Sequence, residues 1–227
     1  MGKINDLKNQ ALATLRGKWG SFVGITFIYF LLVSIASGFT SYGSIFQATS
    51  FSTLYIVCTC SGVLLTLLMI PIGMGFSVAH LHASRQDLPA DPSDLFYGYK
   101  NFWHVLGAFI LAYLAVFAGF ILLVIPGIIL AFAYAMVPFI LRDHPELSVS
   151  ETLWTSRMMM KGHKWELFVL ELSFIGWGLL CILTLCIGYL WLTPYMQMTI
   201  TKFYEKIRAE YEGTGAENTP VERTEIA

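Results

Sequence analysis

One carboxylate, Glu171, lies inside a long apolar stretch. This position makes Glu171 the strongest candidate in the sequence for a functional ionisable group. No other charged residue follows it until after Thr201. On a helix that starts near Trp165, Glu171 would lie about 9 Å deeper than the tryptophan. A charge at mid-bilayer costs roughly 2.5–3.5 kcal/mol on insertion scales, so the carboxylate should face protein or water. Two interpretations follow: a proton or cation site, or a protonated or hydrogen-bonded packing group.

A group of cations precedes that stretch, in the segment SVSETLWTSRMMMKGHK (148–164). The segment begins with a capping-box pattern, Ser148 to Glu151, which predicts the first turn of a helix. Its apolar side chains could rest on lipid while its cations contact anionic headgroups. The segment then binds lipid or a partner, or it only anchors the loop. The cations are Arg157, Lys161 and Lys164.

Other reactive residue types form no recognisable site. His80 and His82 are two apart, which on a helix directs them to nearly opposite sides and makes a poor metal-chelating pair. The four cysteines include no CxxC motif, and burial as small apolar residues is their usual role. We find no phosphate-binding loop, no HExxH and no nucleophile elbow. We therefore expect no metal, no cofactor and no enzymatic activity.

The composition indicates an integral membrane protein. Of 227 residues, 56% are hydrophobic and 13% are charged, whereas a soluble domain carries about a quarter charged residues. The first eighteen residues lack the apolar core of a secretory signal, so we expect the first span to be retained. The fold class predicted is all-α, with six spans in three helical hairpins. The spans are 19–39, 53–79, 102–124, 127–141, 165–186 and 188–206.

Two of the apolar runs are too long for one span. Residues 102–141 would form a helix of about 60 Å, twice the ~30 Å hydrocarbon core. A turn at Pro126 and Gly127 divides this run, and a turn at Gly188 divides the run 167–203. Pro194 should mark a kink whose freed backbone groups neighbouring helices satisfy.

The positive-inside rule tests these turns. With six spans, all 14 Lys and Arg residues fall on one side of the membrane, so both termini are predicted to be cytoplasmic. Without the turns, the cations at 142–164 would move outside. Trp19, Trp103 and Trp165 open three of the spans, each after a basic residue, as interfacial anchors do.

The same three segments suggest an internal repeat within one integral membrane domain, 1–211. Each unit would be an interfacial helix (4–15, 92–100 and 148–160) followed by a helical hairpin. The repeats would be 1–88, 89–147 and 148–211. Alternatively, any set of membrane hairpins has Trp at its interfaces and Gly or Pro in its turns. The tail 212–227 is predicted to be disordered and cytoplasmic.

Three stretches carry a family resemblance: IPGIILAFAY (125–134), LRDHPELSVSETLWTSRMMMKGHKWELFVLELSFIGWGLL (141–180) and LTPYMQMTITKFYE (192–205). The most specific positions are Asp143, Pro145, Ser156, Gly162 and the SFIGW motif. At these positions the chain resembles the bacterial membrane-protein family called domain of unknown function 975. The resemblance extends from LKNQALATLRGKW near the N-terminus to KFYEKI, which is nearly the whole chain. The resemblance implies a multi-pass protein of the bacterial cytoplasmic membrane and no mechanism.

Two classes of function remain from the sequence. In the first, the protein is a non-catalytic membrane factor that binds lipid, an amphiphilic peptide or a membrane partner at its cytoplasmic face. In the second, it is a small transporter or channel whose path uses Glu171. The expected partners are membrane lipids and a membrane protein or a second copy of the chain, with no nucleic acid. Polar residues at depth are few, which favours the first class.

Overall fold

The computed structural model describes residues 2–47, 52–184 and 187–213, and these residues are helical with no β-strand among them. In chain order the elements are α1 (Gly2–Leu15), α2 (Trp19–Gln47), α3 (Ser52–Gln86), the 3-10 helix η1 (Pro92–Asn101), α4 (Phe102–Leu122), α5 (Val124–Ala133), α6 (Val137–Asp143), α7 (Val149–Met159), α8 (Lys164–Leu172), α9 (Ile175–Leu183) and α10 (Tyr189–Gly213). The all-α class is thus confirmed over this part of the chain.

Among the described residues, five helical segments are long and apolar enough to cross a membrane: Trp19–Gly38, Thr59–Gln86, Pro92–Leu122, Val124–Asp143 and Lys164–Leu183. They overlap the first five predicted spans. The helices run further than predicted, because α2 continues to Gln47 and α3 begins at Ser52, so both enter the loop expected at 41–53 between the first two predicted spans. Residues 48–51 of that loop lie outside the described residues.

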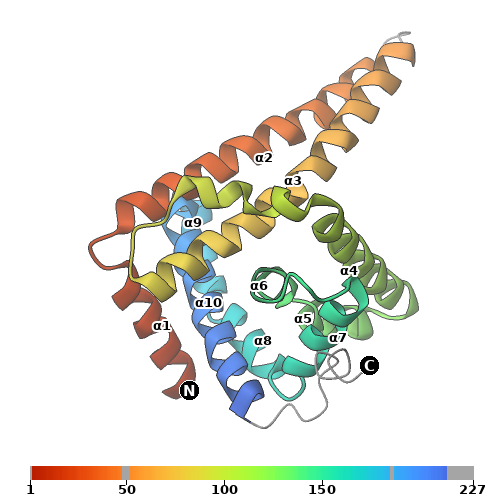
Figure 1. The fold of residues 1–227 in the computed structure, drawn as a ribbon. Helices are drawn as coiled ribbons and strands as arrows, with labels where there is room; N and C mark the ends of the chain where they lie inside the picture. The colour runs from red at the N-terminus through yellow and green to blue at the C-terminus, as the bar shows by residue number, and fades with distance from the viewer. Residues whose placement is uncertain (1, 48–51, 185–186, 214–227) are drawn as a thin grey trace.

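The sixth predicted span, 188–206, falls in α10, which is not among those five segments. This helix carries several polar residues, and it packs against α1, α2, α3 and α9. In Figure 1 α1 and α10 lie side by side below α3. A helix that faces protein needs no continuous apolar surface, so burial explains its composition. Its buried side chains include Leu192, Met198, Phe203, Tyr204 and Ile207.

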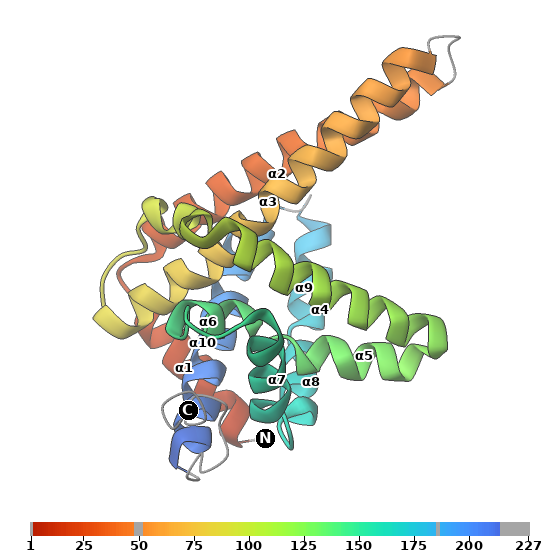
Figure 2. The ribbon, with the colours of Figure 1, turned by 45° about the vertical axis from the view of Figure 1, so that its right-hand side comes forward.

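The chain reverses between α4 and α5, but not at the predicted pair. The reversal is at the extended residue Leu123 (φ −168°, ψ 154°), while Pro126 and Gly127 belong to the first turn of α5. Proline is tolerated there because the first N–H groups of a helix have no intrahelical partner. Gly127 is needed for close packing: a Cβ on it would lie 2.5 Å from the Phe120 ring. The α4–α5 hairpin and the α2–α3 hairpin project from the rest of the molecule in different directions (Figure 2).

Two of the candidate spans are interrupted. Between α5 and α6, residues 134–136 form turns, and Pro138 at the second position of α6 cannot donate a backbone hydrogen bond. The Ala133 carbonyl at this interruption accepts a hydrogen bond of 2.8 Å from the buried Ser156 hydroxyl of α7. Between α8 and α9, Ser173 and Phe174 form a second interruption. Tertiary contacts of this kind allow a helix to break at membrane depth.

A short polar helix precedes α2, α4 and α8 in turn, at the stretches predicted to be interfacial. These are α1, η1 and α7. The 3-10 helix η1 crosses α3 so closely that a Cβ on Gly75 would clash with the Leu95 carbonyl, and one on Gly98 would clash with Pro71. At the other end of the chain, α10 continues to Gly213, two residues into the predicted tail 212–227. The rest of the predicted tail, 214–227, lies outside the described residues.

Candidate functional site

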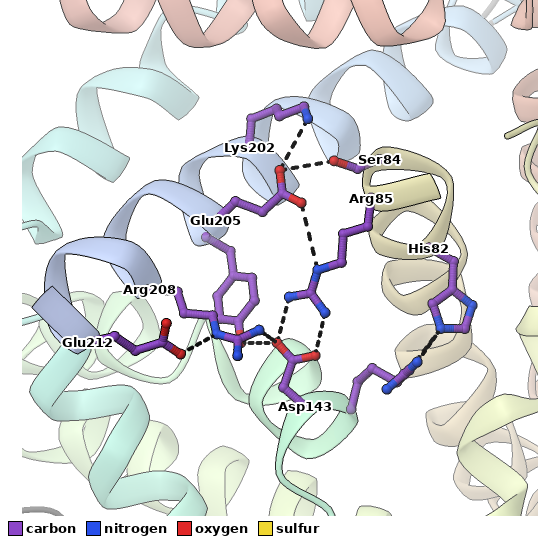
Figure 3. Close-up of polar contacts among 10 residues, drawn as sticks. His82, Ser84, Arg85, Asp143, Lys202, Glu205, Arg208 and Glu212 are labelled. Carbon is purple, nitrogen blue, oxygen red and sulfur yellow. Dashed lines mark hydrogen bonds and ion pairs between the residues drawn. The ribbon is translucent and has the colours of Figure 1, made fainter. Parts of the chain in front are cut away.

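A charged cluster joins the ends of α3, α6 and α10, and Asp143 is at its centre (Figure 3). The Asp143 side chain is 4% exposed. Arg85 donates to both of its carboxylate oxygens at 2.7 Å. Arg208 Nη1 and the Tyr204 hydroxyl donate to Oδ2 at 2.6 and 2.7 Å. One carboxylate therefore binds side chains from two other helices at once.

Further acids balance the two arginines. Glu205 Oε1 lies 3.8 Å from Arg85 Nε, and its Oε2 accepts from Ser84 and Lys202. Arg208 also donates to Glu212 at 2.7 Å. The three acids, Asp143, Glu205 and Glu212, match the three cations, Arg85, Lys202 and Arg208, so the formal charges of the cluster sum to zero.

A second polar chain lies beside this cluster and is centred on His82. The His82 Nδ1 atom lies 3.0 Å from both carboxylate oxygens of Asp94. The Nε2 atom faces Arg142, whose Nε donates to it at 2.9 Å. Because Arg142 can only donate, Nε2 accepts and Nδ1 carries the proton that goes to Asp94. Arg142 also lies over the Tyr97 ring, 5.1 Å from its centroid.

Apolar packing brings the cluster together. Phe139 of α6 stacks on Tyr204 of α10 with ring centroids 4.8 Å apart. Leu81 of α3 and Ile207 of α10 belong to the same buried core. The apolar faces of α3, α6 and α10 meet there, so the polar residues at the ends of these helices meet beside it.

The arrangement suits a clamp better than a catalytic group. The carboxylate of Asp143 is engaged by two guanidinium groups and a phenol, which leaves it little capacity to take or release a proton. Sequence reasoning singled out Asp143 only as part of a family resemblance. The sequence did contain one signal for the cluster: Arg85, Arg142 and Arg208 each lie near the end of the hairpin's second helix in a proposed repeat unit. Nothing in the sequence indicates, however, that Arg85 and Arg208 bind the same carboxylate.

The part of the chain that contains Asp143 matches a known protein family. Residues 110–211 match a family described as "Protein of unknown function (DUF975)". This match over residues 110–211 supports membership of the DUF975 family. The match begins within α4 and ends in α10, so it is shorter than the resemblance traced along nearly the whole chain, and it includes Asp143 and Arg208 but not Arg85. No curated protein and no solved structure matches the chain.

The cations predicted to contact lipid are accessible. Arg157 and Lys161 are exposed, and Lys164 is half-buried at the start of α8. We call these three residues the cationic rim. Within the described residues they form no ion pair, whereas Lys18, Lys202 and Lys206 are each paired with an acid.

The nearby acids are engaged elsewhere. The predicted capping box is confirmed: the Ser148 hydroxyl accepts from the Glu151 N–H, and Glu151 accepts from the Ser148 N–H at 2.8 Å. Hydrogen bonds from the Ser148 hydroxyl and then its N–H lower the pKa of Glu151. Glu166 is held by Lys206 at 2.5 Å. The cationic rim therefore carries positive charge that these acids do not pair.

Glu171 lies in the last turn of α8, just before the interruption at Ser173 and Phe174. Its side chain is half-buried, and among the described residues no hydrogen bond or ion pair reaches its carboxylate. Lys8 of α1 comes close to the interruption, where its ammonium lies 3.5 Å from the Ser173 carbonyl oxygen and 4.3 Å from the Phe174 ring centroid. Both interpretations of this carboxylate, an ion site and a packing group, stay predictions.

The remaining predicted residues are placed as follows. Trp103 and Trp165 are 81% and 72% exposed, as anchors in lipid would be, while Trp19 is half-buried. Gly188 lies in the turn before α10, against Cys181, and Pro194 lies inside α10 without ending it. In the described part of the chain, no group of three or more His, Cys, Asp or Glu residues is arranged to hold a metal ion.

Proposed function

We propose that this protein is a six-span protein of the bacterial cytoplasmic membrane, with both termini in the cytoplasm. The distribution of all 14 Lys and Arg residues supports this orientation. The five apolar segments supply five crossings, and α10 would supply the sixth as a crossing covered by other helices. The three polar helices α1, η1 and α7 would then lie at the cytoplasmic boundary, each opening one of three related units.

At that boundary the protein acts as a non-catalytic factor that binds the headgroups of anionic lipids. The observation that carries this proposal is that the cationic rim forms no ion pair with any described residue and lies beside the exposed Trp154 and Trp165. Indole side chains favour the membrane interface, and each Lys or Arg near an anionic surface contributes about 1 kcal/mol. An amphiphilic peptide or an acidic membrane partner could use the same charges.

The test is lipid binding by the full chain in detergent, measured by native mass spectrometry with phosphatidylglycerol and phosphatidylcholine. The variant R157Q/K161Q/K164Q should bind phosphatidylglycerol at least about tenfold more weakly, because three headgroup contacts are lost. The matched control R157K/K161R/K164R keeps the charges and should bind like the wild type. Equal binding of both lipids by the wild-type protein would contradict the proposal.

Transport is a second candidate, favoured by a specific observation. A carboxylate without a partner among the described residues, Glu171, directly precedes a helix interruption in a candidate span. Broken helices and polar groups at mid-membrane are typical of secondary transporters. In this mechanism Glu171 would carry a proton across the interruption.

Proton flux in proteoliposomes tests this candidate, with an imposed potential and an entrapped pH-sensitive dye. Wild-type protein should conduct protons, and Glu171→Gln should abolish the flux while folding stays intact. The control Glu146→Gln removes an exposed carboxylate outside the candidate spans and should leave the flux unchanged. Absence of flux in the wild type would reject proton transport and reduce Glu171 to a packing group.

A further inference from the structure

Two adjoining cavities lie at the start of α4. Their volumes are about 230 and 420 Å³. They share four residues: Lys100, Asn101, His104 and Pro145. The smaller cavity is closed by apolar side chains of three helices, Met74, Val105 and Leu141. The larger one extends to Phe102 and the exposed Trp103.

The polar side chains shared by both cavities form no hydrogen bond or ion pair with the residues that the structure describes. The His104 Nε2 atom is buried and has no hydrogen-bond partner among the described residues. Asn101 is the N-cap residue of α4, yet its side chain makes no capping hydrogen bond. Lys100 lies over the Tyr97 ring, 4.9 Å from its centroid, and forms no ion pair with an acid in the described part of the chain. A buried polar atom without a partner is costly, so a ligand that supplies one would bind favourably.

The carboxylates of neighbouring segments do not neutralise Lys100. Glu146, next to Pro145, is paired with His144 at 3.1 Å. Asp94 of η1 is bound to His82 at 3.0 Å. The cavities therefore combine one unpaired cation, an amide and an imidazole with an apolar inner wall, which is a chemistry suited to an anion attached to an apolar chain.

We propose that these cavities bind the phosphate of an anionic phospholipid, with Lys100, Asn101 and His104 as its contacts. This inference rests on the proposed lipid-binding function and adds to it a defined site separate from the cationic rim. Lys100 supplies the charge, His104 Nε2 and the Asn101 amide supply hydrogen bonds, and the positive end of the α4 dipole adds to the attraction. Basic pockets between membrane helices on the cytoplasmic side are suited to such headgroups.

The position of Trp103 favours a lipid over a free phosphate ion. Its indole is exposed beside the larger cavity, as interfacial tryptophans are, and exposed apolar residues continue along α4 at Ile110, Leu111 and Leu114. A headgroup in the cavity would leave its acyl chains along this surface. A soluble phosphate would gain nothing from it.

The test uses the full chain in detergent with two probes, phosphatidylglycerol carrying a photoreactive headgroup and soluble glycerol phosphate as competitor. Wild-type protein should cross-link within residues 100–104, and phosphatidylglycerol should bind there. Lys100→Gln should weaken binding at this site at least about tenfold, because a charge-assisted contact is lost. His104→Ala should weaken it several-fold. The control Arg16→Gln removes an exposed cation elsewhere and should leave cross-linking at 100–104 unchanged.

The outcomes separate this site from the cationic rim. Loss of cross-linking at 100–104 in Lys100→Gln, with cross-linking retained in R157Q/K161Q/K164Q, would support the cavity independently of the rim. Full retention in both Lys100→Gln and His104→Ala would overturn the inference, even if the rim variant lost lipid. Displacement of the lipid by glycerol phosphate at equal affinity would assign the site to a soluble phosphate and overturn the lipid source.

Discussion

The single carboxylate of Asp143 holds the ends of three helices, α3, α6 and α10, together. Its carboxylate takes hydrogen bonds from α3 and α10, while its own helix, α6, is only seven residues long. Removing the charge would leave Arg85 and Arg208 facing each other without an acid between them. Losing one partner of a buried ion pair costs about 3–5 kcal/mol, and the partial exposure of both arginines reduces that penalty.

We therefore expect Asp143→Asn to lower the free energy of unfolding by about 2–3 kcal/mol, less than for a fully buried pair because both arginines are partly exposed. Thermal and denaturant unfolding of the detergent-purified protein would measure it. Glu146→Gln, which removes an exposed carboxylate in the next turn of chain, should change stability by less than about 0.5 kcal/mol. Equal stability of the two variants would show that the cluster is not a clamp.

At the scale of the elements, the α4–α5 hairpin depends on two glycines. A Cβ on Gly119 would lie 3.0 Å from Gly127 Cα, and one on Gly127 would lie 2.5 Å from the Phe120 ring. The two helices can approach this closely only because both positions lack a side chain, as in other small-residue helix contacts in membranes. The hairpin is the element that the Pro126 and Gly127 pair makes possible, although the reversal itself is at Leu123.

Gly127→Ala should destabilise the protein by about 1–2 kcal/mol, because overpacking outweighs the gain in helix propensity. The matched control is Gly176→Ala in α9, where a Cβ would meet no atom within 4 Å. That control should be neutral or slightly stabilising. Unfolding curves of the two variants decide between tight packing and a loose hairpin, since a loose hairpin would give both variants the same stability.

For the whole molecule the decisive property is the side of the membrane on which each connection lies. Gly127 is a poor site for cysteine labelling, because a cysteine at this tightly packed position would disturb the α4–α5 hairpin. Leu123, at the reversal, and Ile187, before α10, are 66% and 59% exposed and are better labelling sites.

In a cysteine-free background, Leu123→Cys and Ile187→Cys should both react with an impermeant maleimide in intact cells. Arg157→Cys should react only after permeabilisation, because the cationic rim is proposed to be cytoplasmic. Labelling of Ile187→Cys only after permeabilisation would place both ends of α10 on the same side. The six-span arrangement would then be wrong, and α10 would be a helix that packs under the bundle without crossing.

The sequence by itself determined the class of the protein, its apolar segments and the start of α7. Transfer of a segment into lipid depends on the sum of its own residues, and a capping box such as Ser148 and Glu151 is complete within four positions. Both are local properties, so they can be read without knowing the fold.

Only the tertiary structure decided which charges are paired and which are free. Asp143 is far in sequence from Arg85 and Arg208, so their contact depends on how α3, α6 and α10 pack. The same packing buries much of α10, which therefore fails a test of hydropathy, and it leaves Lys100 and the cationic rim without an acid partner among the described residues. Pairing and burial are relations between distant segments, and a chain read residue by residue does not contain the distances that set them.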